Sequence, residues 1–310
     1  MWKYVIKRVL WVIPVLLGAS FLVFSLLHFA PGKPVDVFLQ ADATAEEKAE
    51  FNAKYGLDQP FFTQYFNYIK NIVTKFDFGR SYKNNIQITQ RITETYPKTM
   101  RLAGMALLIM VSVGLPLGVL SAIKHYSLLD SIVSVLGIFG VSMPNFWLGL
   151  QLILVFALIL DLLPPSGNST PAHYILPALT IGLAGAANLM RVTRSSILEV
   201  LKQDYINTAR AKGQSERVVI WRHMLRNALL PIVTVIGMQF SGVMGNAITV
   251  ETIFGISGLP KMMIDGINFR DYIVVQGGVL AIAGTCCIMN LLTDLSYALI
   301  DPRIKAQYKQ

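Results

Sequence analysis

Residues 228–250 read ALLPIVTVIGMQFSGVMGNAITV, a stretch without a single Asp, Glu, Lys or Arg. A helix needs about 20 consecutive, mostly apolar residues to cross the hydrocarbon core of a bilayer. This stretch is long enough to do so. It predicts a membrane-spanning helix and makes lipid the solvent for part of the chain.

The same test finds five further uncharged runs, at residues 9–27, 102–123, 131–160, 175–190 and 272–293. The run at 175–190 is short, and it reaches spanning length only if its helix continues through Arg191 and Arg194, with those side chains extended toward the headgroups. No segment shows the two-residue alternation of a half-buried strand. We therefore predict an all-α integral membrane protein with six transmembrane helices.

The composition agrees with this fold class. Of the 310 residues, 54% are hydrophobic and 15% are charged, whereas a soluble domain carries about 25% charged residues. The net charge of +9 does not indicate nucleic acid as a partner, because the basic residues fall mostly in a few short loops. The adjacent Cys286 and Cys287 have neither metal-ligand spacing nor disulfide partners, and we interpret them as packing residues.

The Lys and Arg residues of the short loops predict the orientation, since they concentrate on the cytoplasmic side. The loops 161–174 and 251–271 hold only Lys261 and Arg270. The opposite side holds fifteen basic residues, which are Lys3, Lys7, Arg8, Lys124, Arg191, Arg194, Lys202, Arg210, Lys212, Arg217, Arg222, Arg226, Arg303, Lys305 and Lys309. We expect both termini to be cytoplasmic.

Three segments follow from these runs. Residues 1–30 form an N-terminal segment with the first transmembrane helix, whose apolar run exceeds the roughly 7–15 residues of a cleaved signal core and is expected to be retained. Residues 31–98 form a long, partly helical extracytoplasmic loop. Residues 99–310 form a five-helix core that contains a cytoplasmic loop at 191–226.

Two helices are predicted inside the long loop. Thr44 is the expected N-cap of the first, with Glu47 three residues later and Gly56 just past its end. The second contains aromatic and aliphatic residues at helical spacing, which predict one apolar face made of Phe62, Tyr65, Phe66 and Ile69. Such a face suits the outer ends of the spans or the membrane interface.

Small residues and prolines recur within the predicted spans. Glycines allow helix backbones to approach closely in lipid, and the ones singled out are Gly104, Gly114, Gly118, Gly182, Gly185, Gly237, Gly242 and Gly245. Pro116, Pro144 and Pro231 predict breaks or kinks, which are common around cavities and moving parts. Ordinary helix packing explains the same residues equally well.

Motifs of nucleotide hydrolysis and metal chemistry are missing from the sequence. Gly32-Lys33 is followed by Pro34, so it is not the Gly-Lys-Ser/Thr of a phosphate-binding loop. There is no HExxH pair and no Cys/His cluster. We predict no catalytic residue, no cofactor and no metal ligand in this chain.

A serine protease is the rival from another class. Residues 255–258 read GISG, which resembles the nucleophile motif of rhomboid proteases. A serine nucleophile needs a base within hydrogen-bond reach, and none of the four histidines lies in an uncharged run. We interpret Ser257, followed by Pro260, as part of a plain turn.

Residues 204–231, DYINTARAKGQSERVVIWRHMLRNALLP, form the densest polar stretch of the chain. Ile206, Ala209 and Gly213 share one helical face of little bulk, and Gly213 is expected to end that helix before a second begins at Gln214-Ser215. A short helix tethered between two spans, with a face of small residues, suits docking into a groove of another protein. The alternative is that cytoplasmic loops are simply basic.

The chain closely resembles the membrane subunits of bacterial ABC importers of the dipeptide/oligopeptide (and nickel) class. The resemblance covers nearly the whole length and rests on these segments: LLHFAPGKPV, YGLDQP, FGRSY, SMPNFWLG, MRVTRSSILEVLKQDYINTARAKGQSERVVIWRHMLRNALLPIVTVIG, ETIFGISGLP, RDYIVVQGGVL and DPRI. It implies the type I importer fold, a bacterial plasma membrane location and transport of peptides by alternating access.

The resemblance also implies partners. Family members pair with a second, homologous permease, two ATPase subunits that bind ATP and Mg, and an extracytoplasmic binding protein. A coupling helix docks on the ATPase, and it maps here to Tyr205, Ala209, Arg210, Ala211, Lys212 and Gly213. The core Thr208-Ala209-Arg210 departs from the Glu-Ala-Ala typical of other importers. No residue of the substrate pathway is assigned.

Other cargoes remain open at this point. Nickel, nickel chelates, glutathione and oligosaccharide fragments fit the same architecture, although no His or Cys cluster lines a span. A membrane scaffold that transports nothing is a further alternative.

Overall fold

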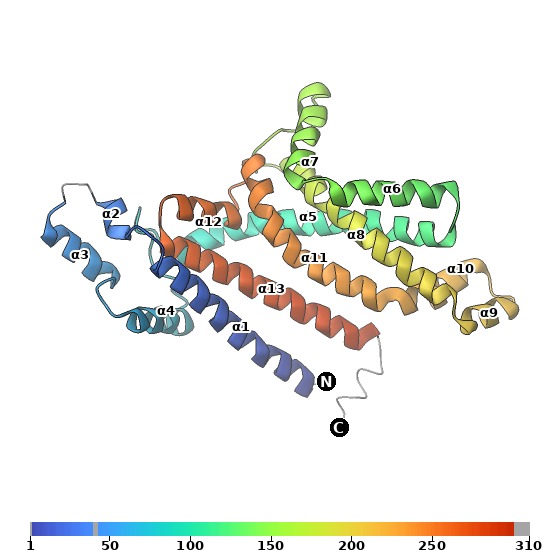
Figure 1. Ribbon diagram of the computed structural model, residues 1–310, viewed down its shortest axis with the longest axis horizontal. Coiled ribbons are helices and arrows are strands. Elements are labelled where there is room, and N and C mark those ends of the chain that lie inside the picture. The colour runs from blue at the N-terminus through green and yellow to red at the C-terminus, as the bar shows by residue number, and fades with distance from the viewer. Residues whose placement is uncertain (1, 40–42, 301–310) are drawn as a thin grey trace. The chain divides into compact units, whose positions relative to one another are not determined.

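The computed structural model describes residues 2–39 and 43–300, so the DPRI motif and the basic residues Arg303, Lys305 and Lys309 lie outside the described residues. Figure 1 shows that the described chain is built from helices. In these ranges the only β-type pairing is an isolated bridge between Arg80 and Gln87. The all-α prediction is confirmed.

The chain runs through thirteen numbered α-helices and three short segments of other helix types within the described ranges. In order these are α1 (Trp2–His28), α2 (Pro34–Phe38), α3 (Ala45–Tyr55), α4 (Phe61–Lys75), α5 (Ile88–Ile123), α6 (Leu128–Ser142), α7 (Asn145–Leu152), the π-helix η1 (Ile153–Ile159), the 3₁₀ helix η2 (Pro171–Tyr174), α8 (Ile175–Leu201), α9 (Asp204–Ala211), α10 (Glu216–Val218), the π-helix η3 (Val219–Leu225), α11 (Arg226–Ile253), α12 (Leu259–Asn268) and α13 (Tyr272–Ile300).

Five of the described helices are long and apolar enough to cross a membrane. The remaining predicted span, at residues 131–160, is a bent pair of helices, because α6 and the helix over Asn145–Ile159 meet at 106°. The break is at Met143, whose ψ of 125° is extended, and Pro144. The ring of a proline disfavours helical backbone in the residue before it, so the uncharged run at 131–160 forms two pieces and not one straight span.

The short fourth run behaves as predicted. Helix α8 continues through Arg191 and Arg194 and ends at Leu201. The additional turns give it spanning length.

By its internal contacts the chain divides into two compact units. The first unit comprises residues 1–8, 100–256 and 288–310, and the second comprises residues 9–99 and 257–287. Several helices therefore contribute one part to each unit.

Helix α8 is the centre of the first unit, where it contacts α6, α7 and α11 (Figure 1). In its most apolar window 61% of the residues are buried, against 33% for the span that contains α11. Two glycines allow α5 to pack closely against α8. A Cβ at Gly114 would lie only 2.6 Å from the carbonyl oxygen of Ala186, and a Cβ at Gly118 would lie only 2.6 Å from that of Met190. The predicted close packing is confirmed at Gly114 and Gly118, whereas a Cβ at Gly104 or Gly245 would meet nothing within 4 Å.

The second unit contains both helices predicted in the long loop. Thr44 and Glu47 form the reciprocal cap of α3, and Gly56 ends it in the left-handed conformation at φ 68°. These predictions are confirmed.

The expected apolar face of α4 is only partly right. Phe62 and Phe66 are 63% and 68% exposed, whereas the aromatic rings that contact Phe24 of α1 are those of Phe61, Tyr65 and Tyr68. Both stripes have helical spacing, so periodicity alone does not choose between them.

Candidate functional site

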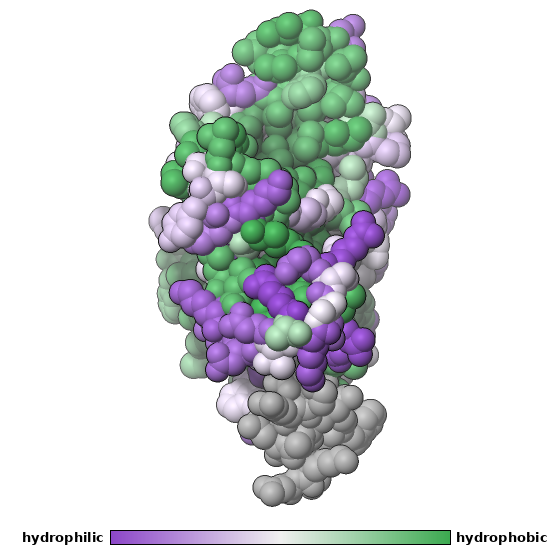
Figure 2. Space-filling view, turned by 90° about the vertical axis from the view of Figure 1, so that its right-hand side faces the viewer, coloured by the Kyte–Doolittle hydropathy of each residue, from purple (hydrophilic) through white to green (hydrophobic). Residues whose placement is uncertain are grey.

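The predicted coupling segment forms a separate surface helix, α9, followed by a tight turn and α10. Figure 2 shows hydrophilic side chains gathered over the end of the first unit that carries these two helices. Of the six residues assigned to coupling, Tyr205, Arg210, Ala211, Lys212 and Gly213 are exposed. The sixth, Ala209, is only 4% exposed.

The small-residue face of α9 turns inward. Ile206 is fully buried, and together with Ala209 it packs into an apolar cluster with Val219, Met224 and Leu225. Our expectation that this face docks outward is therefore wrong, because Ile206 and Ala209 are the apolar positions by which the helix attaches to its own chain. The surface that α9 offers to another protein is the opposite one.

A rigid turn ends α9. Gly213 has φ +73°, a left-handed conformation that glycine adopts without a steric penalty. The amides of Gly213 and Gln214 donate to the carbonyls of Arg210 and Ala209, at 2.9 and 3.3 Å. Arg210 also pairs with Glu216 of α10 at 2.8 Å. Gly213 ends the helix as predicted; backbone hydrogen bonds close the turn on α9, and the Arg210–Glu216 pair connects α9 to α10.

Tyr205 lies near the start of α9 and is 42% exposed. Partial burial raises the pKa of its hydroxyl above the ordinary value. The phenol therefore stays protonated at neutral pH, as a hydrogen-bond donor on the exposed surface of α9.

A polar cluster, which sequence reasoning missed, links the ends of three helices of the first unit. Asp130 of α6 accepts hydrogen bonds from Arg194 of α8 at 2.7 and 2.9 Å and from Ser121 of α5 at 2.5 Å. His125 lies 3.1 Å from the carboxylate, and the Tyr126 amide donates to it at 3.0 Å. Asp130 stands just outside the long uncharged run, where its charge looks like that of an ordinary helix start.

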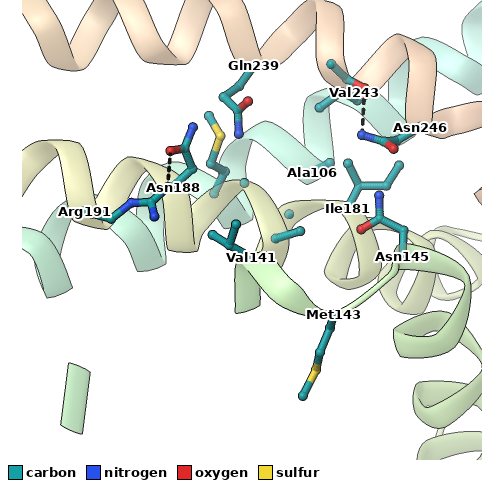
Figure 3. Close-up of a pocket in the computed structure, with 15 residues that line it drawn as sticks. Ala106, Val141, Met143, Asn145, Ile181, Asn188, Arg191, Gln239, Val243 and Asn246 are labelled. Carbon is teal, nitrogen blue, oxygen red and sulfur yellow. Dashed lines mark hydrogen bonds between the residues drawn. The ribbon is translucent and has the colours of Figure 1, made fainter. Parts of the chain in front are cut away.

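The first unit also contains a cavity of about 410 Å³, lined by residues of α5, α6, α7, α8 and α11. Figure 3 shows polar side chains from α8, α11 and the start of α7 around this space. They are the carboxamides Asn145, Asn188, Gln239 and Asn246 and one cation, Arg191.

The carboxamides of this cavity keep hydrogen-bonding capacity in reserve. Asn188 accepts a hydrogen bond from Arg191 at 3.3 Å, and Asn246 donates to the carbonyl of Gly242 at 3.0 Å. Polar side chains inside spanning helices face a bundle interior or a water-filled path rather than lipid. Their positions inside otherwise apolar runs are the signal from which the sequence would have identified them.

The serine of the rival hypothesis lies in the short segment before α12. Ser257 is exposed, and in the described residues no histidine is hydrogen-bonded to it. Residues 2–39 and 43–300 also contain no group of three His, Cys, Asp or Glu residues placed to hold a metal ion. This geometry does not support the serine protease hypothesis.

Comparison with known proteins finds two matching families. Residues 114–306 match the family described as the binding-protein-dependent transport system inner membrane component, and residues 1–103 match the N-terminal family of the same membrane components.

Curated relatives match over almost the full length. The chain is 38% identical to the dipeptide transport system permease protein DppB of Escherichia coli K12 over 98% of this chain and 99% of the relative. It is 37% identical to DppB of Alkalihalophilus pseudofirmus over 98% and 100%. It is 38% identical to the glutathione transport system permease protein GsiC of E. coli K12 over 98% and 99%.

Solved structures support the fold. The methionine ABC transporter MetNI, in an inward-facing conformation, matches with a TM-score of 0.58 at 15% identity, covering 69% of this chain and 97% of that one. An amino acid ABC transporter matches with a TM-score of 0.51 at 17% identity, covering 69% and 94%. At this identity the likeness is one of fold alone.

Proposed function

Since this chain belongs to the family of binding-protein-dependent transport system inner membrane components, we propose that it forms half of the translocation pathway of an ATP-driven importer of dipeptides or oligopeptides. The observation that carries the cargo is the identity of 37–38% to two DppB permeases over at least 98% of the chain. The chain is a multi-pass membrane protein by its five or six apolar helices.

We infer that both termini and α9 lie in the cytoplasm of a bacterial cell. The Lys and Arg bias of the short loops supports this orientation. The segment at 31–98 then faces outward, where an extracytoplasmic binding protein delivers peptide.

The exposed surface of α9 is the proposed ATPase contact. Tyr205, Arg210, Ala211, Lys212 and Gly213 supply that surface, and buried Ala209 positions it. Because α9 is clamped to its own chain by the apolar cluster and by the Arg210–Glu216 pair, a movement of the ATPase transmits to the spans as a displacement of a rigid element.

The cavity of the first unit is the proposed section of the peptide path. Carboxamides pair equally well with the N–H and C=O groups of any peptide main chain, so they suit a permease that accepts peptides of varied sequence. Arg191 supplies a partner for a carboxylate.

The partners are a second, homologous permease, two ATPase subunits and a peptide-binding protein. ATP and Mg belong to the ATPase subunits, and this chain itself binds no cofactor. Its contribution is conformational, as alternating access requires.

The test is purification from native membranes in mild detergent, followed by reconstitution with the co-purifying subunits and binding protein. We expect ATP-dependent uptake of radiolabelled Ala-Phe. An assembled complex that takes up no peptide would contradict the proposal.

Glutathione is the second candidate cargo, because GsiC is as similar to this chain as DppB is. Uptake of glutathione that Ala-Phe does not compete would favour it over dipeptides. Mass spectrometry of the ligand carried by the co-purifying binding protein separates glutathione, dipeptide and nickel complexes directly.

The α9 contact has its own test. Lys212→Glu reverses a charge on the exposed surface and should reduce recovery of ATPase subunits with the permease. Lys124→Glu makes the same change in another loop on the predicted cytoplasmic side and serves as the matched control. Equal loss in both variants would point to general charge effects and against an α9 contact.

A further inference from the structure

A second cavity lies entirely within the second unit and is distinct from the proposed path. It measures about 360 Å³ and is formed by α1, α3, α4, the segment after α4 and the start of α13. Pockets for small molecules begin at about 300 Å³. The cavity is therefore large enough for a ligand the size of a dipeptide.

The buried part of its lining, which forms the floor, is aromatic. The rings of Phe24, Phe78 and Tyr82 are buried, and Tyr55, Tyr68 and Tyr272 are half-buried around them. Burial raises the pKa of the Tyr68 and Tyr82 hydroxyls well above the ordinary value, so these rings remain neutral. Such a surface suits an apolar or aromatic side chain.

The carboxamide of Gln276 is the most buried of those that line this cavity. Gln276 of α13 lines it, is only 9% exposed, and makes no hydrogen bond in the part of the chain that the structure describes. The Tyr68 hydroxyl, which lines the same cavity, is buried and has no hydrogen-bond partner in the described residues, and nearly all such groups in proteins are satisfied. Both side chains are placed to pair with a group that enters the cavity.

The more exposed part of the lining, which forms the rim, carries both signs of charge. Lys54 and Arg80 supply cations, and Asp77 supplies a carboxylate. Arg80 donates a hydrogen bond to the carbonyl of Asn85 at 3.2 Å, and Asp77 accepts one from the amide of Gly79 at 2.9 Å. The protein's own backbone therefore holds both side chains at the rim. The cavity of the first unit differs, since its only charged lining residue in the described chain is Arg191.

The lining segment is firmly anchored within the unit. Asp271, which is 2% exposed, accepts hydrogen bonds from the Ser81 hydroxyl at 2.5 Å and the Tyr82 amide at 3.2 Å. Tyr272 donates to the carbonyl of Gly32 at 2.8 Å. The walls of the cavity are therefore organised in advance, which lowers the entropic cost of binding.

We propose that this cavity binds a short zwitterionic peptide, with an apolar side chain on the aromatic floor, a main-chain amide on Gln276 and the two termini on Asp77 and the Lys54–Arg80 pair. The peptide class rests on the proposed function. The site itself rests on the residues of the second unit and gives the permease a place to hold cargo apart from the cavity of the first unit.

The experiment uses the assembled transporter, purified without its binding protein. The photo-crosslinker p-benzoylphenylalanine replaces Asn71, which lines the cavity on α4, and captures radiolabelled Ala-Phe. The control position is Val73 on the same helix, which is 77% exposed and does not line the cavity. We expect capture from position 71 and none from position 73.

Two leucine substitutions then identify the cavity. Gln276→Leu, in the Asn71 crosslinking background, should lower capture about fivefold to tenfold, as expected for one buried hydrogen bond. Gln239→Leu, the same substitution in the first unit, should leave capture at position 71 unchanged. N-acetylated or C-amidated Ala-Phe should compete less well than the free dipeptide.

Thermal unfolding of the variant distinguishes a loss of peptide binding from a loss of folding. Because Gln276 makes no hydrogen bond within the described chain, Gln276→Leu should leave the unfolding temperature unchanged or raise it while it weakens capture. A lower unfolding temperature would show that Gln276 has a structural partner and would overturn the proposal.

The outcomes separate this inference from the proposed function. Peptide uptake by the complete transporter without capture at position 71 would overturn the second site and leave the permease function intact. In a second reaction the binding protein is added back, and its capture at position 71 in place of the peptide would show that the occupant is a loop of that partner, which also overturns the second site. Absence of peptide uptake would contradict the proposed function directly.

Discussion

Arg194 donates hydrogen bonds to both carboxylate oxygens of Asp130, from Nε at 2.7 Å and from Nη2 at 2.9 Å. The pair joins the start of α6 to the C-terminal part of α8, ten positions before α9 begins at Asp204. Because α8 leads directly into α9, the pair fixes the stem on which the proposed coupling helix is mounted.

Asp130→Asn should destabilise the protein by about 2–3 kcal/mol. Removing one partner of a fully buried pair costs roughly 3–5 kcal/mol. The cost is smaller here because the Arg194 side chain is 28% exposed. Thermal unfolding in detergent measures the change. Arg194→Lys should lose part of the same stability, since Lys cannot make the two-pronged contact.

The matched control is Asp36→Asn, which removes an ion pair with Lys48 at 3.7 Å between two exposed side chains. It should change stability by less than about 0.5 kcal/mol. An equal effect of the two substitutions would remove the case for Asp130 as a structural anchor.

The same substitution at two glycines of α5 should have opposite effects. Gly114→Ala would place a Cβ 2.6 Å from the carbonyl oxygen of Ala186 and should cost about 1–3 kcal/mol. Gly104→Ala meets nothing within 4 Å and should stabilise the helix by up to about 1 kcal/mol. Unfolding temperatures of the two variants, measured side by side, give the sign; equal signs would contradict the close approach of α5 to α8.

The sequence alone predicts what depends on local chemistry. Uncharged runs locate the spans, Thr44 and Glu47 locate the start of α3, and Gly213 locates the end of α9, because each signal acts within a few residues of its effect. The family resemblance is likewise a property of local motifs and is confirmed by the comparisons.

Features that depend on distant contacts could not be predicted in this way. Asp130 and Arg194 stand far apart in the sequence, and only the packing of α6 on α8 brings them together. Which stripe of α4 is buried depends on where Phe24 lies. The inward face of α9 follows from the apolar cluster beneath it, and the sequence of the helix shows only that Ile206 and Ala209 share a side.

Alkaline pH should destabilise the second unit through Tyr82. This residue is 9% exposed, and its burial, followed by the nearby charge of Asp271, raises its pKa well above the ordinary value. In the unfolded chain Tyr ionises near pH 10, whereas the folded state keeps the proton. Stability is therefore intact below about pH 10 and falls as the pH rises beyond it, by at most about 1.4 kcal/mol per pH unit.

Tyr82→Phe should flatten that loss of stability between about pH 10 and pH 11.5. The measurement is the unfolding temperature in detergent as a function of pH. Tyr126→Phe, at a position that is 90% exposed, is the control and should leave the slope as in the wild type. Identical slopes for all three proteins would show that Tyr82 does not govern the alkaline transition.

Gly213 offers the sharpest test of transmission through α9. Its φ of +73° is left-handed, and a Cβ there would meet nothing within 4 Å, so any penalty comes from the backbone alone. Ala should cost about 1 kcal/mol, Asn should cost less because it tolerates this conformation, and Pro cannot adopt it. Peptide uptake and stimulated ATPase activity of the reconstituted transporter should fall in the order Gly, Asn, Ala, Pro.

Gly56 provides the comparison, since it ends α3 at φ +68° and has only the Gln59 side chain nearby, at 3.9 Å. Gly56→Ala therefore carries a similar backbone penalty in the second unit. It should lower the unfolding temperature by a similar amount without lowering ATPase stimulation per assembled complex. If Gly213→Pro transports as well as the wild type, α9 does not act as a rigid coupling element, and ATPase movements must reach the spans by another contact.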